Sequence, residues 1–193
     1  TVYHFTFASD RWESALEIEA NRMRNCRFDP KEVEAEKQVV IEELKSTLDS
    51  PWPNLAIEAG KELYRGHPYA RPVIGLEPEI LAMTPEDLRA FYNKHYVPNN
   101  AVLVLVGDFQ ADGILRTVAE RFGSIPAGAP LAPRASPPRP AQEAERRTEL
   151  THGTVVDRLL VGFATVRVGD PEDPVLDVIS TVLGEGRSCR LYR

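Results

Sequence analysis

Cysteine is scarce in this chain, because only Cys26 and Cys189 carry thiols among its 193 residues. Two cysteines that lie so far apart in the sequence cannot form a metal site by themselves. Nothing else in the sequence requires a disulfide between them, so two free thiols are the simplest interpretation. The low cysteine count therefore excludes a zinc site that is built from cysteine alone.

Long apolar runs and an excess of basic residues are also absent. The longest apolar run, residues 101–106, has the length of a β-strand, whereas a transmembrane helix needs about 20 such residues. The chain has 23 Lys and Arg against 29 Asp and Glu, a net charge of −6, so no basic face competes with the acidic excess. We therefore expect neither a membrane segment nor a nucleic-acid partner.

The beginning of the chain lacks the features of a complete precursor. Thr1 stands where an initiator methionine would, and neither a basic segment nor an apolar signal segment follows it. We therefore expect Thr1 to be an interior position of a longer gene product, with any targeting signal outside this sequence. The cellular location stays open, because a periplasmic and a cytoplasmic location are equally compatible with the sequence.

Helical periodicity and capping signals predict six helices, and alternating or β-branched runs predict four strands. The expected helices cover residues 10–26, 28–49, 51–64, 84–96, 110–122 and 173–183. Residues 184–193 are expected to form a turn that enters a further short helix. The expected strands cover residues 1–8, 101–109, 147–152 and 155–166. The strand at 101–109 is apolar on both sides, which is typical of a sheet centre with both faces covered.

The composition changes abruptly after Ile125. Residues 126–140 hold six of the sixteen prolines, with alanine, glycine and serine between them. Such a segment is semi-rigid and extended, as interdomain linkers are. We therefore expect a first domain in residues 1–125, a proline-rich linker in residues 126–142, and the beginning of a second domain in residues 143–193.

The helix expected over residues 28–49 carries the candidate functional residues. Asp29 is a typical N-cap for it. At about 100° per residue, one side of this helix forms an apolar stripe. The members of the stripe are Val33, Val40, Ile41, Leu44 and Leu48. Glu36 and Glu43, two turns apart, point almost the same way on one flank of the stripe, whereas Glu42 points away from it.

Two interpretations of Glu36 and Glu43 are open at this point. A carboxylate beside an apolar stripe is partly removed from water and needs a partner, which suits a functional site. The other interpretation is that both are ordinary flanking glutamates that pair with lysine or arginine. The helical spacing alone does not decide between them.

Histidine is rare and dispersed in the sequence. The four histidines are His4, His67, His95 and His152, and no two of them have the spacing of a helical ligand pair. The motifs HExxH, HxxEH and GxSxG, a phosphate loop and a dinucleotide fingerprint are all absent. We interpret His67, in the glycine-rich and proline-rich loop at residues 66–75, as a hydrogen-bonding or surface residue. The chain taken alone therefore does not contain a complete catalytic site.

Five segments of the chain follow one another in a family-specific order and spacing. They read TVYHFTFASDRWESALEIEANRMRN, EAEKQVVIEEL, HPYARPVIG, FYNKHYVPNNAVLVLVGDF and LGEGRSCRLYR. In this order the sequence resembles the pitrilysin/insulinase family of inverted zinc metallopeptidases, which includes mitochondrial processing peptidases and many bacterial zinc proteases. The resemblance covers nearly the whole chain except the proline-rich linker.

The resemblance implies a zinc ligand in this chain. In that family, two histidines of an HxxEH motif on one helix and a glutamate on a second helix hold one zinc ion. The family pattern ExxVxxxE matches residues 36–43, so Glu43 is the implied metal ligand and Glu36 the residue that orients a ligand histidine. The general base of HxxEH is expected upstream of Thr1, so no catalytic residue is expected within the chain.

The resemblance also implies a fold and a function. The expected fold is α+β, a two-layer mixed sheet with helices, in a first domain that is incomplete at its N-terminus and a second that is only begun. The expected function is zinc-dependent endoproteolysis of peptides or unfolded segments, with this fragment inactive alone. The alternatives are a catalytically silent core or partner subunit of the same fold and a generic α+β binding domain. The expected partners are a peptide substrate and either a second peptidase-like subunit or another copy of the chain.

Overall fold

The structure is a computed structural model that describes residues 1–133, 137–138 and 140–193. It divides into two compact units. The first unit comprises Thr1–Asp49 and Val73–Pro137, and the second comprises Ser50–Pro72 and Pro138–Arg193. Part of the linker expected over residues 126–142 lies outside the described residues.

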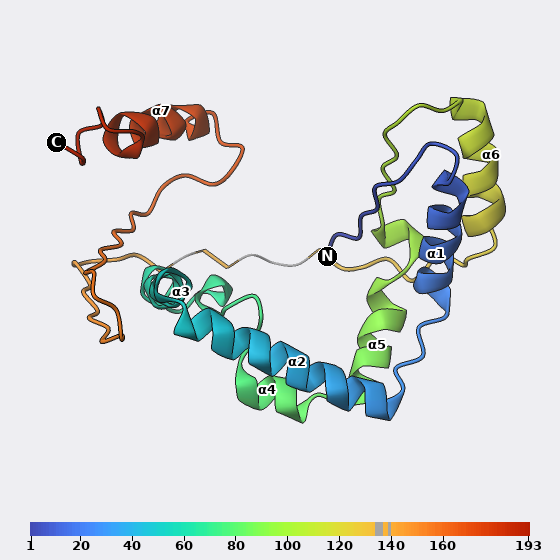
Figure 1. The fold of residues 1–193 in the computed structure, drawn as a ribbon, viewed down its shortest axis with the longest axis horizontal. Coiled ribbons are helices and arrows are strands. Elements are labelled where there is room, and N and C mark those ends of the chain that lie inside the picture. The colour runs from blue at the N-terminus through green and yellow to red at the C-terminus, as the bar shows by residue number, and fades with distance from the viewer. Residues whose placement is uncertain (134–136, 139) are drawn as a thin grey trace. The chain divides into compact units, whose positions relative to one another are not determined.

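All regular structure in the described residues is helical (Figure 1). The elements are α1 (Trp12–Arg24), α2 (Pro30–Asp49), α3 (Pro51–Leu63), η1 (Pro68–Ala70), α4 (Glu77–Ala82), α5 (Pro85–His95), η2 (Pro98–Asn100), α6 (Ala111–Phe122) and α7 (Asp173–Gly184). Within the described residues, no helix combines the length and the apolar composition that a membrane span requires.

The predicted α+β fold with a two-layer mixed sheet is wrong, because no described residue lies in a strand. The segments expected to be strands, residues 1–8, 101–109, 147–152 and 155–166, run as irregular chain (Figure 1). A strand forms only where its backbone bonds to a neighbouring backbone, and no such ladder forms among the described residues. As a result, Val102, Val104 and Val106 are 90%, 75% and 92% exposed instead of buried.

Local signals place the starts of two helices correctly. Asp29 caps α2 as predicted, because its Oδ1 accepts hydrogen bonds from the backbone N–H groups of Lys31 at 2.9 Å and Glu32 at 3.4 Å. α5 begins with a capping box. Thr84 Oγ1 accepts from the Asp87 N–H at 3.1 Å, and Asp87 Oδ2 accepts from the Thr84 N–H at 3.0 Å.

Two helix pairs pack together in the first unit. α1 packs on α6, where Leu16 and Ile114 are almost fully buried. α2 packs on α4 through a buried cluster. The members of this cluster are Ile41, Leu44 and Ile80, with Val40 and Ile74 packed against them. The second contact determines which face α2 turns to solvent.

Tyr92 on α5 joins that helix to the last turn of α1 and to the connection between α1 and α2. Its hydroxyl donates to the carbonyl oxygen of Arg22 at 2.6 Å, and its ring packs edge-on against Phe28 with centroids 5.4 Å apart. Phe28 has a φ of 53°, a left-handed conformation that is uncommon in residues other than glycine. Tyr92 thus supports the turn through which the chain enters α2.

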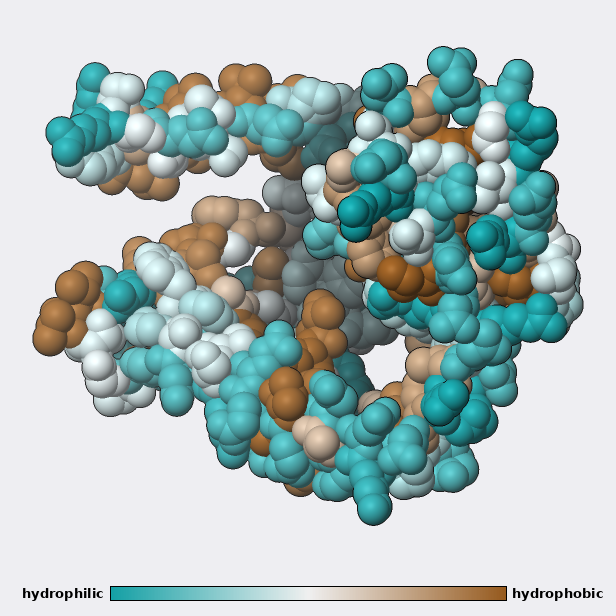
Figure 2. All heavy atoms as spheres, turned by 45° about the vertical axis from the view of Figure 1, so that its right-hand side comes forward, coloured by the Kyte–Doolittle hydropathy of each residue, from teal (hydrophilic) through white to brown (hydrophobic). Residues whose placement is uncertain are grey.

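Polar and cation–π contacts join α3 to later segments of the second unit. The guanidinium of Arg146 donates to the carbonyl oxygen of Glu62 on α3, and the guanidinium of Arg158 lies 5.8 Å from the ring centroid of Trp52. α7 contains no buried residue, and apolar side chains reach the surface at many points of the described chain (Figure 2). The short helix expected after residue 184 does not form, because residues 185–192 make turns and bends.

Candidate metal centre

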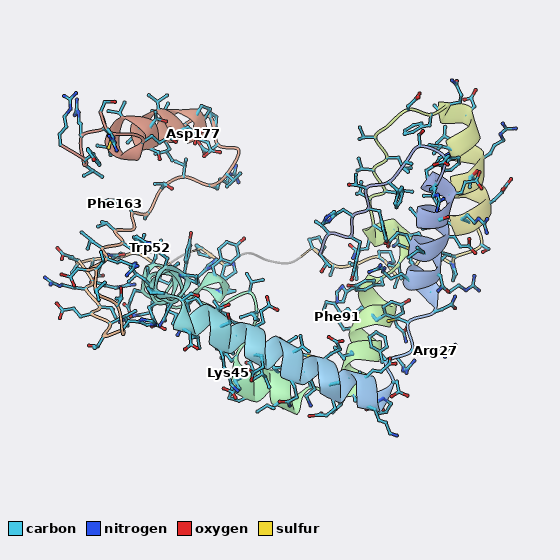
Figure 3. The ribbon with its side chains drawn as sticks, viewed as in Figure 1. Arg27, Lys45, Trp52, Phe91, Phe163 and Asp177 are labelled. Atoms are coloured by element: carbon cyan, nitrogen blue, oxygen red, sulfur yellow. The ribbon has the colours of Figure 1, made fainter. Side chains whose placement is uncertain are left out.

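The candidate metal residues lie on α2, the longest described helix, which Figure 3 shows with its side chains. Val33, Ile41 and Leu44 are buried and Val40 is half-buried, as the predicted apolar stripe requires, whereas Leu48 is 37% exposed. Seven residues turn an α-helix by about 700°, so Glu36 and Glu43 project within roughly 20° of each other. Because α2 is helical throughout residues 30–49, the two side chains leave the helix on the same side, next to the buried residues.

Ion pairs occupy two neighbouring glutamates of the same helix. Glu34 Oε2 lies 3.0 Å from Lys37 Nζ, and Glu42 Oε1 lies 2.8 Å from Lys45 Nζ. The hydrogen bond from Lys37 lowers the pKa of Glu34, and the hydrogen bond to Glu42 raises the pKa of Lys45. Both pairs are i, i+3 contacts on the helix surface, so these glutamates already have partners.

Glu36 and Glu43 differ from those neighbours because neither forms an ion pair with any described residue. Both side chains are exposed, so the expectation that they are partly removed from water is wrong for the described chain. α4 covers α2 beside Ile41 and Leu44 and leaves the flank that carries Glu43 open. The carboxylate of Glu43 is thus free to bind a group that approaches from solvent.

The backbone of Glu43 has a side-chain contact of its own. Thr47 Oγ1 donates a hydrogen bond to the carbonyl oxygen of Glu43 at 2.9 Å, one turn further along α2. This contact is in addition to the regular helical bonds, and it ties the turn that carries the carboxylate to the turn that follows. Glu43 therefore projects from a helix interior, where the backbone is well held, and not from a frayed end.

Two of the four histidines, His67 and His95, make local contacts. His67 Nδ1 accepts a hydrogen bond from the Tyr69 N–H at 3.1 Å, which caps η1, and the ring of His95 packs on Phe91 with centroids 4.4 Å apart. The described residues contain no group of three His, Cys, Asp or Glu side chains that could hold a metal ion. The structure does not bring the sequence-predicted residues Glu36 and Glu43 into a complete ligand set.

One exposed carboxylate fits one position of a catalytic zinc site. Such sites use three protein ligands and leave a fourth position open, and a carboxylate oxygen is an accepted ligand beside two histidines. The donor chemistry of Glu43 suits this role, because its oxygens are not committed to an ion pair among the described residues. A single carboxylate is one of the three protein ligands that such a site needs.

Two hollows of the described surface lie away from these glutamates. The first, of about 770 Å³, is lined by Asn93, Lys94, His95, Asn100 and residues 129–132. The second, of about 330 Å³, lies in the second unit between α3 and residues 142–162. Neither Glu36 nor Glu43 lines either hollow, so Glu43 stands on an open helix face.

Comparison with protein families places the chain. The family described as insulinase (peptidase family M16) matches residues 1–77, and the family described as peptidase M16 inactive domain matches residues 82–193. The chain belongs to peptidase family M16. The resemblance in the five sequence segments is therefore confirmed, and the M16 match over residues 1–77 includes all of α2.

Relatives of this M16 chain are named as zinc proteases. An uncharacterized zinc protease of Mycobacterium tuberculosis is 32% identical over all of this chain and 44% of its own length. The uncharacterized zinc protease YmxG of Bacillus subtilis is 27% identical over all of this chain and 46% of its own length. This M16 chain thus spans less than half the length of these curated relatives.

A solved structure resembles part of the M16 chain. The periplasmic protease PqqL from Escherichia coli matches 68% of this chain and 15% of its own length, with 26% identity and a TM-score of 0.60. The structure of the first half of the same protease matches with a TM-score of 0.59. The fold likeness and the family match therefore point to the same group of proteins.

One element beside the candidate ligand was missed in the sequence. α4 lies between the loop at residues 66–75 and α5, and it supplies Ile80 to the cluster under α2. Its six residues are too few for a helical period to be visible. The signal that predicts it is Pro78 at the second helical position between Glu77 and Glu79, which are both in the first turn.

Proposed function

We propose that the full-length protein is a zinc-dependent metalloendopeptidase of the inverted zincin type, and that Glu43 is one of its zinc ligands. Membership of the peptidase family M16 supports the reaction class. One observation of the structure carries the assignment of Glu43. It is exposed and unpaired among the described residues, while its neighbour Glu42 is held by Lys45.

The proposal gives two residues of α2 a defined role. Glu43 supplies a carboxylate oxygen to the metal, and Glu36 accepts a hydrogen bond from the free ring N–H of a ligand histidine, which fixes the orientation of that ring. When bound, zinc polarises the scissile carbonyl and makes a water molecule more acidic. Two histidines and the general-base glutamate of an HxxEH motif come from a part of the protein outside this chain.

The proposal extends to organisation and partners. Residues 1–125 belong to the metal-site domain, residues 126–142 link the domains, and residues 143–193 begin a second domain. The concentration of proline after Ile125 supports this division. The substrate is a peptide or an unfolded segment, and the partner is a second peptidase-like subunit or another copy of the same protein.

The test compares matched glutamine variants of the full-length protein. Glu43→Gln should lower the zinc content, measured by atomic emission after dialysis, by more than about tenfold, because it removes a charged ligand. Glu42→Gln should leave the zinc content unchanged, because it disrupts only the surface pair with Lys45. Glu36→Gln should weaken zinc affinity by about tenfold through the loss of a supporting hydrogen bond.

Hydrolysis of a quenched fluorescent peptide is measured on the same samples. Loss of activity is expected to follow loss of zinc in the Glu43 variant and to be absent in the Glu42 variant. Equal zinc contents of the two variants would contradict the assignment. The isolated 193-residue chain should retain negligible zinc, because it supplies one ligand of three, and stoichiometric zinc in it would also contradict the proposal.

A second candidate function is a catalytically silent core or partner subunit. The observation behind this alternative is that residues 82–193 match a family described as the peptidase M16 inactive domain. Under this alternative the wild-type full-length protein retains no zinc and cleaves no peptide. The first measurement of the series, zinc content of the wild-type protein, therefore separates the two functions before any variant is made.

A further inference from the structure

The contact between α2 and α4 lies next to the proposed zinc ligand. Ile41 and Leu44 of α2 and Ile80 of α4 are 3%, 7% and 7% exposed and form one buried cluster. Glu43 stands between Ile41 and Leu44 in the sequence, so a single helical turn carries the buried cluster on one side and the carboxylate on its flank. The contacts that stabilise the cluster therefore also fix the direction in which the Glu43 side chain projects.

α4 has a single apolar anchor on α2. Ile80 is its only buried residue, whereas the adjacent Leu81 is 46% exposed. A helix of six residues is not stable by itself, because the cost of forming the first turn is not recovered by so few hydrogen bonds. The position of α4 along α2 (Figure 1) therefore depends on the burial of Ile80.

The backbone conformation before α4 determines where Ile80 lies. Gly75 has a φ of 92°, a left-handed conformation that glycine adopts without strain. The carbonyl oxygen of Leu76 then accepts hydrogen bonds from the N–H groups of Glu79 at 2.9 Å and Ile80 at 3.0 Å. The turn at Gly75 and this first helical turn together hold Ile80 against α2.

We propose that Ile80 is a positioning residue for the zinc ligand Glu43. The inference rests on the proposed function and adds a residue on another helix that determines how well Glu43 binds. Zinc sites accept ligand distances within about 0.2 Å of the ideal value, so a loosely held helical turn weakens binding. Ile80 packs in one buried cluster with Ile41 and Leu44, and this packing resists rotation and fraying of the turn that carries Glu43.

The experiment uses the full-length protein with Ile80→Ala and, as the matched control, Leu81→Ala. Both variants remove an aliphatic side chain from α4, but only the first removes a buried one. Zinc affinity is measured by competition with a chromophoric chelator, at a temperature where near-UV circular dichroism indicates full folding. Ile80→Ala should bind zinc about tenfold more weakly, and Leu81→Ala should bind like wild type.

A second readout reports on ligand placement and not on stability. The visible absorption of the cobalt-substituted protein depends on the ligands and their geometry, and it should change in Ile80→Ala but not in Leu81→Ala. Ile80→Val keeps the protein folded if the alanine variant does not fold, and it should bind zinc about threefold more weakly than wild type. Identical affinity and cobalt spectra in the Ile80 and Leu81 variants would overturn the proposal.

The zinc measurements on Glu43→Gln separate this inference from the proposed function. If Glu43→Gln loses zinc while the Ile80 variants bind like Leu81→Ala, Glu43 remains the ligand and the positioning role of Ile80 is refuted. If Glu43→Gln retains zinc, the proposed ligand itself is refuted, and the inference about Ile80 falls with it.

Discussion

Removing the hydroxyl of Tyr92 tests how α2 is anchored at its beginning. The hydroxyl donates to the carbonyl oxygen of Arg22 at 2.6 Å and accepts a longer bond from the Cys26 N–H at 3.5 Å. Arg22 lies in the last turn of α1, where carbonyl groups have no helical partner, so the hydroxyl satisfies an otherwise unpaired acceptor. Tyr92→Phe removes both bonds and keeps the ring.

The expected loss of stability in Tyr92→Phe depends on the hydrogen bonds that are removed and on the ring contacts that remain. Tyr92 is 7% exposed and its bond to Arg22 is partly buried, so water replaces the missing hydroxyl only in part. An unsatisfied buried acceptor costs about 1–3 kcal/mol. We expect Tyr92→Phe to lower the free energy of unfolding by about 1–2 kcal/mol, because the phenyl ring keeps its contact with Phe28. Tyr92→Ala, which also removes the ring, should cost about 3–5 kcal/mol.

Urea unfolding followed by circular dichroism measures both variants. Tyr192→Phe is the matched control, because it makes the same chemical change at a side chain that is 65% exposed. The control should shift the unfolding midpoint very little, since surface substitutions usually change stability by less than about 0.5 kcal/mol. Equal effects of the two tyrosine-to-phenylalanine substitutions would refute the role given to the Tyr92 hydroxyl.

Two further predictions concern stability. Thr84→Ala should lower the thermal stability by about 1 kcal/mol, because α5 loses the cap oxygen that accepts from the Asp87 N–H; an unchanged unfolding temperature would contradict this. Burial and the Tyr96 hydroxyl raise the pKa of Tyr3 to about 12. The unfolded chain loses this proton near pH 10, so the contribution of Tyr3 to stability is present below pH 10 and should be lost between about pH 10 and 12. Tyr3 is 44% exposed, so the decline should be shallow, and Tyr3→Phe should remove it in an alkaline titration of unfolding.

The helix starts were predictable because their causes are local. Asp29 reaches N–H groups only two and three residues away, and Thr84 and Asp87 bond to each other across one turn. Such contacts require no information about the rest of the fold, so the residue types and their spacing are sufficient. The direction of Glu43 on α2 was predictable for the same reason, because helical periodicity is also local.

The sheet could not be inferred in the same way, because strand pairing is not local. The alternation in residues 1–8 and the apolar run at 101–109 indicate a preference for extended backbone, but not which segment will pair with them. Without a hydrogen-bonding neighbour, an extended preference yields irregular chain with exposed valines such as Val102 and Val106. A pattern of side chains is therefore weaker evidence for a strand than a capped helical period is for a helix.

The direction of the glutamates on α2 has a local cause, whereas their exposure to solvent has a tertiary cause. Helical periodicity places Glu36 and Glu43 on the flank of the apolar stripe, but their exposure depends on what packs on α2, and α4 comes from a distant part of the sequence. The ion pair of Glu42 with Lys45 is an i, i+3 contact and could have been predicted. It strengthens the choice of Glu43 as the ligand, because Glu42 already has a partner on the helix surface and its carboxylate points away from the stripe that α4 holds in place.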